Sequence, residues 1–100
     1  MDPDLPDLTI ADVVVSTAGR DAGKLFYVLE TDDAWLTLVN GKDRTIEKPK
    51  RKKSKHTRKV LRSDTRVAAK LRSGDKVLNS DLRRDLADLS RELQSNNLGG

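Results

Sequence analysis

Residues 12–29 read DVVVSTAGRDAGKLFYVL, and this stretch decides the fold. Two runs of β-branched, aromatic and other apolar residues flank a polar loop that contains Gly19 and Gly23. β-Branched and aromatic side chains favour extended backbone, and glycine accepts the positive φ angles of a tight loop. The stretch therefore predicts two antiparallel strands joined by a turn, with structure starting near Thr9.

Three further strands are expected downstream. The run WLTLV at 35–39 is followed by Asn40 and Gly41, a pair that favours a tight hairpin turn, so the next strand is expected over 43–47. A fifth short strand is expected within 55–61. Four or five strands in about fifty residues are too few for a sandwich, and a curved barrel closes its own edges. We therefore predict a small β-barrel over residues 9–62.

The last third of the chain changes to helical spacing. Ser63 or Asp64 is expected to cap a short helix ending at Gly74, and Ser80 to cap a second one, giving a helical tail over 63–95. Residues 1–8 are rich in proline and aspartate and predict a flexible N-terminus, whereas 96–100 lack periodicity and are expected to fray. The predicted class is mainly β, and α+β overall.

Leucines form a stripe on one face of the second predicted helix. They are spaced by four, three and four residues, which places them on the same side of a helix. The stripe needs a partner surface, which is either the protein's own barrel or first helix, or another molecule. Packing within the chain is the commoner case. The residues of this possible partner-binding face are Leu82, Leu86, Leu89 and Leu93.

A basic run between residues 48 and 62 indicates the class of partner. It contains nine Lys or Arg and no acidic residue, although the whole chain has a formal net charge of only +4. The rest of the chain is therefore net acidic, and the positive charge is concentrated between a predicted strand and a predicted helix. Charge concentrated at a fixed place on a fold is typical of proteins that bind polyanions such as nucleic acids.

The loop GRDAGK at 19–24 has the form Gly-[Lys/Arg]-Asp-x-Gly-Lys at every position and lies between two apolar runs. Residues 12–29 thus resemble a KOW motif, and the likeness extends over residues 9–60. This region is similar to KOW proteins related to archaeal and eukaryotic large-subunit ribosomal proteins, and to small stand-alone bacterial KOW proteins. The resemblance implies an SH3-like barrel and RNA binding, often to ribosomal RNA.

The chemistry of the loop is consistent with phosphate binding, although a plain turn has the same spacing. Gly19 and Gly23 are able to expose backbone amides, and the adjoining basic run favours contact with phosphate. Trp35 and Tyr27 are candidates for stacking on bases, but packing is the commoner role for such residues. The predicted RNA-binding residues are Gly19, Arg20, Gly23, Lys24, Lys48, Lys50, Arg51, Lys52, Lys53, Lys55, His56, Arg58 and Lys59.

Other functional classes have less support in the sequence. The chain has no cysteine and one histidine, so neither a metal centre nor a cofactor is expected. No nucleophile and base are spaced as in known catalytic motifs, so we do not expect an enzyme. The acidic N-terminus and the lack of a long apolar stretch predict a soluble, cytoplasmic protein without a membrane partner.

The sequence therefore predicts a non-catalytic RNA-binding protein that is ribosomal or ribosome-associated and acts in translation. The alternative is a protein-interaction module, for example in transcription or translation complexes, that uses the leucine face or the barrel. Duplex DNA is a weaker expectation, because Arg83 and Arg84 share their predicted helix with four acidic residues, at positions 81, 85, 88 and 92, that would repel a phosphate backbone.

Overall fold

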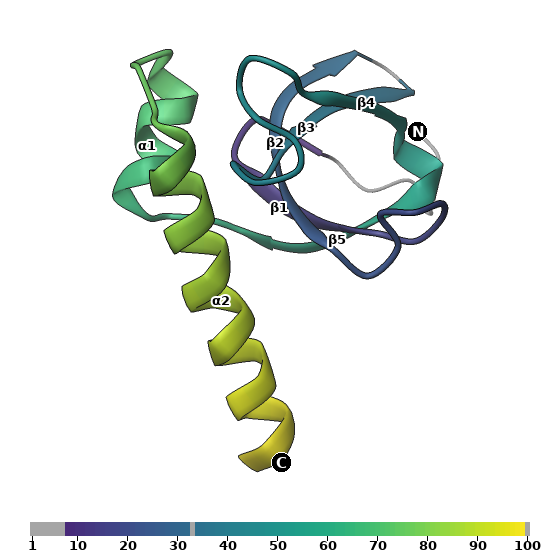
Figure 1. The fold of residues 1–100 in the computed structure, drawn as a ribbon, viewed down its shortest axis with the longest axis vertical. Coiled ribbons are helices and arrows are strands. Elements are labelled where there is room, and N and C mark those ends of the chain that lie inside the picture. The colour runs from purple at the N-terminus through teal and green to yellow at the C-terminus, as the bar shows by residue number, and fades with distance from the viewer. Residues whose placement is uncertain (1–7, 33, 100) are drawn as a thin grey trace.

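The fold is α+β, a five-stranded antiparallel sheet followed by two helices (Figure 1). The computed structural model describes residues 8–32 and 34–99. The N-terminal segment predicted to be flexible lies outside these residues, apart from Leu8. The elements are β1 (Asp12–Ser16), β2 (Leu25–Asp32), β3 (Trp35–Val39), β4 (Lys50–Lys53), the 3₁₀ turn η1 (Ser54–His56), β5 (Thr57–Arg62), α1 (Arg66–Ser73) and α2 (Asn79–Gly99).

The strands lie in the order β4-β3-β2-β1-β5. Shifts in register between Val13 and Val14 and between Val28 and Glu30 interrupt two of the ladders, and such bulges bend a sheet. In the described part of the chain β4 and β5 are the two edge strands, so the hydrogen-bonded ladder is open between them. The expectation of a barrel that closes its own edges is therefore not met. The curved sheet is visible in Figure 1.

The fourth strand was predicted in the wrong place. Residues 43–47 form bends, and β4 is instead the first part of the basic run. The Asn40 side chain explains the difference, because its Oδ1 accepts hydrogen bonds from the amides of Lys42 (2.9 Å) and Arg44 (3.0 Å). The chain therefore makes a wider loop than a two-residue hairpin turn, and it pairs with β3 only after Pro49.

Gly41 lies in this loop where α2 crosses closest to it. Its φ is +77°, and an added Cβ would overlap the carbonyl oxygen of Asn79 and lie 3.0 Å from the Leu82 Cβ. We expect Gly41→Ala to lower the free energy of unfolding by about 3 kcal/mol, because the left-handed backbone and the overlap both penalise a side chain. Gly23→Ala is the control, since φ is +87° but no atom lies within 4 Å.

Chemical denaturation of both variants measures this difference. Gly23→Ala should cost only about 1 to 2 kcal/mol, the penalty of the left-handed backbone alone. Equal losses in the two variants would show that α2 does not approach Gly41 as closely as the structure places it.

The strands bury side chains on both faces of the sheet. The inner, concave core consists of Val14, Phe26, Val28, Leu36 and Leu38. The outer core lies between the sheet and the helices, and contains Ala11, Val13, Tyr27, Val39, Ala68, Leu71, Val77, Leu82 and Leu86. Residues that alternate along a strand thus alternate between two cores, as the pleat of a strand requires.

Both helices lie on one side of the sheet, and α2 extends past it (Figure 1). Thr65, not Ser63 or Asp64, caps α1, since its Oγ1 accepts a hydrogen bond from the Ala68 amide at 3.1 Å. Gly74 ends α1 with a φ of 77°, as predicted. Helix α2 begins at Asn79 and continues to Gly99, past the expected end at residue 95.

Tyr27 connects the sheet to both helices. Its hydroxyl donates to the Asp85 carboxylate on α2 (2.8 Å) and lies 2.9 Å from the Ser63 Oγ. The Thr65 hydroxyl donates to the same carboxylate at 2.6 Å. Burial raises the pKa of the Tyr27 phenol, and the neighbouring carboxylate raises it further. Tyr27 is thus a buried structural residue, which removes it from the candidates for base stacking.

Candidate nucleic-acid interface

The basic run forms three consecutive elements, β4, η1 and β5. Both strands are at edges of the sheet, so one side of each backbone is not paired with a further strand. In β4, alternation places Arg51 and Lys53 in the exposed positions and Lys50 and Lys52 in half-buried ones. The predicted continuous run is therefore divided by the pleat into two groups with different surroundings.

The Lys52 side chain makes hydrogen bonds within the protein. Its Nζ donates to the Ser16 Oγ at 2.8 Å and to the Ala18 carbonyl oxygen at 2.7 Å. These bonds join β4 to the end of β1, across the side where the ladder is open. Two of the three ammonium protons are therefore committed to partners within the chain, which gives Lys52 a structural role.

The exposed cations of the run are Lys48, Arg51, Lys53, Lys55, Arg58, Lys59 and Arg62. Among the described residues, no carboxylate lies within ion-pair distance of Lys48, Lys53, Lys55 or Arg58. Arg51 is 4.0 Å from the exposed Asp32 carboxylate, a weak contact in water. We call the four residues Arg51, Lys53, Lys55 and Arg58 the basic surface.

The other basic residues of the run, and His56, are half-buried or have a partner within the chain. Lys59 lies 3.4 Å from the carboxylate of Asp12, which is fully buried. A buried carboxylate needs a compensating charge, so Lys59 contributes to the fold. His56 is half-buried, and its carbonyl oxygen accepts a hydrogen bond from the Thr17 amide at 2.9 Å. Lys50 is half-buried at the start of β4.

The glycine loop is a closed turn. Gly19 and Gly23 have φ angles of 79° and 87°, as expected for residues that enable a tight turn. The Gly23 amide, however, donates to the Ser16 carbonyl at 2.8 Å, so it is not available to a phosphate. Arg20 is exposed at the tip of the loop. The loop therefore presents the Arg20 side chain, whereas the Gly23 amide, which was expected to be exposed, is hydrogen-bonded within the turn.

Lys24 is paired within the protein. Its Nζ donates to the Asp43 Oδ2 at 2.7 Å, between exposed side chains of two loops. The hydrogen bond and the charge of Lys24 lower the pKa of Asp43, and Asp43 raises the pKa of Lys24. The pair stabilises the fold above the ordinary pKa of the carboxyl, and this contribution is lost as the pH falls through the lowered value.

An NMR titration of Asp43 tests this pair. In the wild type its pKa should lie below the ordinary value of 3.8, and in Lys24→Gln it should return towards that value because the main cause of the shift is removed. Lys42→Gln is the control, since Lys42 is a smaller cause of the same shift. A wild-type pKa at or above 3.8 would contradict the pairing.

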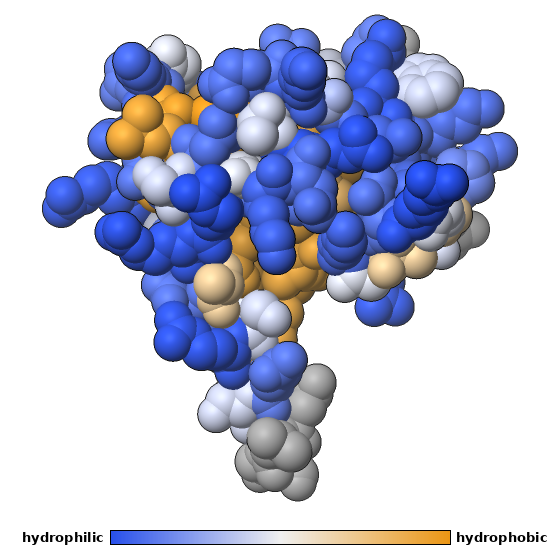
Figure 2. All heavy atoms as spheres, in the orientation of Figure 1, coloured by the Kyte–Doolittle hydropathy of each residue, from blue (hydrophilic) through white to orange (hydrophobic). Residues whose placement is uncertain are grey.

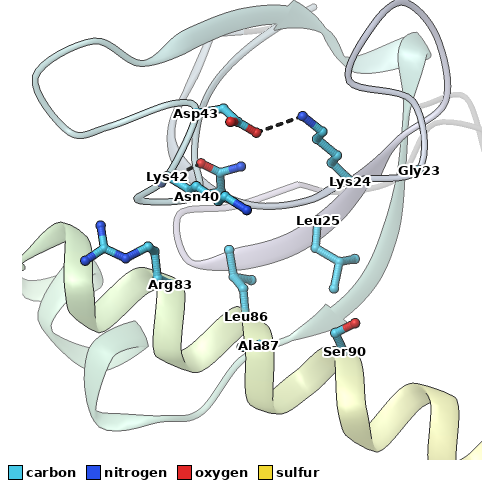
Figure 3. Close-up of a pocket in the computed structure, with 10 residues that line it drawn as sticks. All are labelled: Gly23, Lys24, Leu25, Asn40, Lys42, Asp43, Arg83, Leu86, Ala87 and Ser90. Carbon is cyan, nitrogen blue, oxygen red and sulfur yellow. Dashed lines mark hydrogen bonds and ion pairs between the residues drawn. The ribbon is translucent and has the colours of Figure 1, made fainter.

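A groove lies between the loops and α2 (Figure 3), with a volume of about 880 Å³. Leu25, Leu86 and Ala87 contribute its apolar wall. Figure 3 shows Lys24 and Asp43 facing each other on the loop side. Arg83, on α2, donates to the Gly41 carbonyl at 2.7 Å. The cations Lys24 and Arg83 are thus held by partners within the chain, unlike those of the basic surface.

The leucine face of α2 packs mainly on the protein itself. Leu82 and Leu86 are buried in the outer core, and Leu89 packs against it. Leu93 is half-buried. On the side drawn in Figure 2, hydrophilic residues cover most of the surface, and apolar residues are seen where α2 meets the sheet and near the connection between the helices. Packing within the chain is confirmed, and Leu82 and Leu86 are not available to a partner.

Three important partners were missed by sequence reasoning. Asp12 and Asp43 neutralise basic residues predicted to bind RNA, and Ser16 accepts a hydrogen bond from Lys52. None of these pairs has a local signal, because the Lys24 and Lys52 hydrogen bonds span 19 and 36 positions. The tertiary fold, and not the local sequence, brings these residues together.

Neither a protein-family model nor a curated protein sequence matches this chain. None of the helices in the described ranges is long and apolar enough to cross a membrane.

Proposed function

We propose that this protein is a non-catalytic, cytoplasmic RNA-binding protein of the KOW class that binds structured RNA on or near the ribosome. One observation carries the proposal: four exposed cations follow each other along β4, η1 and β5 in a segment without a carboxylate. These residues lie on the two edge strands of the sheet and on the turn between them. Such an arrangement suits a phosphate backbone, which offers closely spaced negative charges.

The sheet supports the fold implied by the KOW resemblance. β1 pairs with both β2 and β5, β3 pairs with both β2 and β4, and a single 3₁₀ turn connects the two edges. This order is consistent with an SH3-like barrel whose ladder is open on one side. We assign Arg20, in the loop of the motif, as a further contact, and Lys48 as a peripheral one.

The proposed mechanism is electrostatic positioning. The sheet and its hydrogen bonds fix the basic surface, so the backbone loses little conformational freedom when RNA binds. Contacts between these cations and phosphates release counterions, which supplies the affinity, and they place the protein on its RNA without reading the base sequence. The interaction-module alternative loses the main feature in its favour, because Leu82 and Leu86 are buried.

Co-sedimentation with ribosomes tests the proposal. The protein should pellet with ribosomes at about 50 mM monovalent salt and be released at about 500 mM, because counterion release weakens phosphate contacts steeply. A protein that stays in the supernatant at both concentrations would contradict a ribosomal role. Release by added structured RNA but not by equal amounts of duplex DNA would support RNA as the ligand.

A further inference from the structure

Trp35 is an aromatic residue that belongs to neither hydrophobic core. It begins β3, and its side chain is 39% exposed. Its neighbours Leu36 and Leu38 point into the inner core, so Trp35 and Val39 belong to the outer face of the same strand. The helices cover Val39, whereas they leave Trp35 accessible. It is the only tryptophan in the chain.

Two cations of the basic surface lie over the Trp35 ring. The register of β3 and β4 places Lys53 directly opposite Trp35 and Arg51 opposite Thr37. The Arg51 Cζ lies 5.2 Å and the Lys53 Nζ 5.6 Å from the ring centroid, within the range of cation–π attraction. Both side chains belong to exposed positions of β4. The ring therefore lies next to two of the four cations of the basic surface.

An exposed aromatic ring among cations fits an unpaired nucleotide. A base has two apolar faces that gain by stacking on a tryptophan, and its flanking phosphates need positive charge within a few ångströms. A continuous duplex has no free base face to offer, because its bases stack on one another. An acidic protein segment would use the cations but would gain little from the ring.

We propose that Trp35 is a base-stacking site for an unpaired nucleotide of RNA, with Arg51 and Lys53 binding the phosphates on either side of it. This inference rests on the proposed function, since it takes the basic surface to be the RNA interface. It adds a preference that charge alone does not give: the interface favours single-stranded segments, loops and bulges over uninterrupted duplex.

Trp35 itself reports on the site, because its fluorescence is the only tryptophan signal. The probes are a labelled adenine oligonucleotide of about ten residues and a blunt RNA duplex of the same length, with affinity measured by anisotropy of the label. The oligonucleotide should quench Trp35 fluorescence at the concentrations at which it binds. The duplex should bind through phosphate contacts with little quenching.

The variant Trp35→Ala should bind the oligonucleotide about 5- to 100-fold more weakly, the usual loss for one stacked base, with duplex affinity within about twofold of wild type. Trp35→Phe keeps an aromatic ring and should recover much of the difference; it decides the result if Trp35→Ala does not fold. Leu78→Ala is the control for losing an exposed apolar side chain, and it should change neither affinity.

Three outcomes overturn the inference in distinguishable ways. In the first, folded Trp35→Ala binds the oligonucleotide as the wild type does, and the oligonucleotide does not quench the wild-type fluorescence. The aliphatic parts of Arg51 and Lys53 then only cover the ring, and the proposed function still holds. Equal losses for oligonucleotide and duplex mean that Trp35 supports the basic surface and does not stack. No binding of either RNA by the wild type at low salt removes the proposed function as well.

Discussion

Replacing the basic surface by glutamine, in the variant Arg51→Gln/Lys53→Gln/Lys55→Gln/Arg58→Gln, should weaken the binding of structured RNA about 100- to 1000-fold at about 0.1 M salt. Each neutralised phosphate contributes somewhat under one decade of affinity at this salt concentration, so losing three or four contacts removes two to three decades. The four side chains are exposed, and the fold should therefore tolerate the change. Fluorescence anisotropy of a labelled ribosomal RNA fragment measures the loss.

The matched control removes the same charge from another place. Arg66, Lys76, Arg84 and Arg91 are exposed residues in or next to the helices, and changing all four to glutamine gives the same net charge. Because charges in solution are screened over about 10 Å, this control should lose less than about fivefold. Similar losses in both variants would mean that RNA responds to net charge alone, and the assignment of β4, η1 and β5 as the interface would be wrong.

Removing the Leu82 side chain should produce the largest loss of stability among side-chain truncations of α2. Leu82 is 0% exposed and packs in the outer core with Tyr27 and Val39. We expect Leu82→Ala to lower the free energy of unfolding by about 3 kcal/mol, the sum of lost burial and a residual cavity. In a domain of this size, this is a large share of the total stability.

Leu93→Ala provides the comparison within the same helix. Leu93 is half-buried and lies further along α2, so the loss should stay below about 1 kcal/mol. Thermal and urea denaturation of both variants distinguish the two positions. Below its melting transition, Leu82→Ala should bind RNA as the wild type does. A stable Leu82→Ala protein would contradict the packing of α2 on the sheet and would return this leucine face to the possible partner-binding surfaces.

The first half of the fold follows from local signals. The apolar runs on either side of Gly19 and Gly23 predict β1, β2 and the turn between them, and the structure has all three. The chain ends α1 at Gly74 for the same reason, since the left-handed residue at a helix end is a local requirement. These features depend on residues that are neighbours in the sequence.

The fourth strand could not be placed from local signals. Asn40 and Gly41 have the sequence of a tight hairpin, but the Asn40 side chain binds the amides of its own loop. The Ile46 amide donates to the Asn79 Oδ1 at 2.9 Å, a bond to a residue 33 positions away that only the folded helix supplies. The orientation of Phe26 and Tyr27 was equally hidden, because both faces of β2 are covered by apolar groups.

At the candidate site, too, the sequence predicts some features of the basic run and not others. Sequence identifies the segment and its charge, but it does not separate cations that face solvent from those that hold the fold. Lys52 and Lys59 contact Ser16 and Asp12, whereas the exposed Lys53 and Lys55 have no ion-pair or side-chain hydrogen-bond partner among the described residues. The pleat of β4 and the register of β1 with β5 make this distinction. The proposed interface is therefore smaller and better defined than the nine charges predict.

The salt dependence of RNA affinity tests the central claim most directly. Dissociation constants of the wild-type protein for a structured ribosomal RNA fragment, measured between about 50 and 300 mM salt, should give a plot of log affinity against log salt with a slope of about −3 to −5, as four to six phosphate contacts require. The basic-surface variant should show a slope nearer zero. Undetectable affinity at the lowest salt, or a wild-type affinity that does not change with salt, would contradict an RNA interface built on these cations.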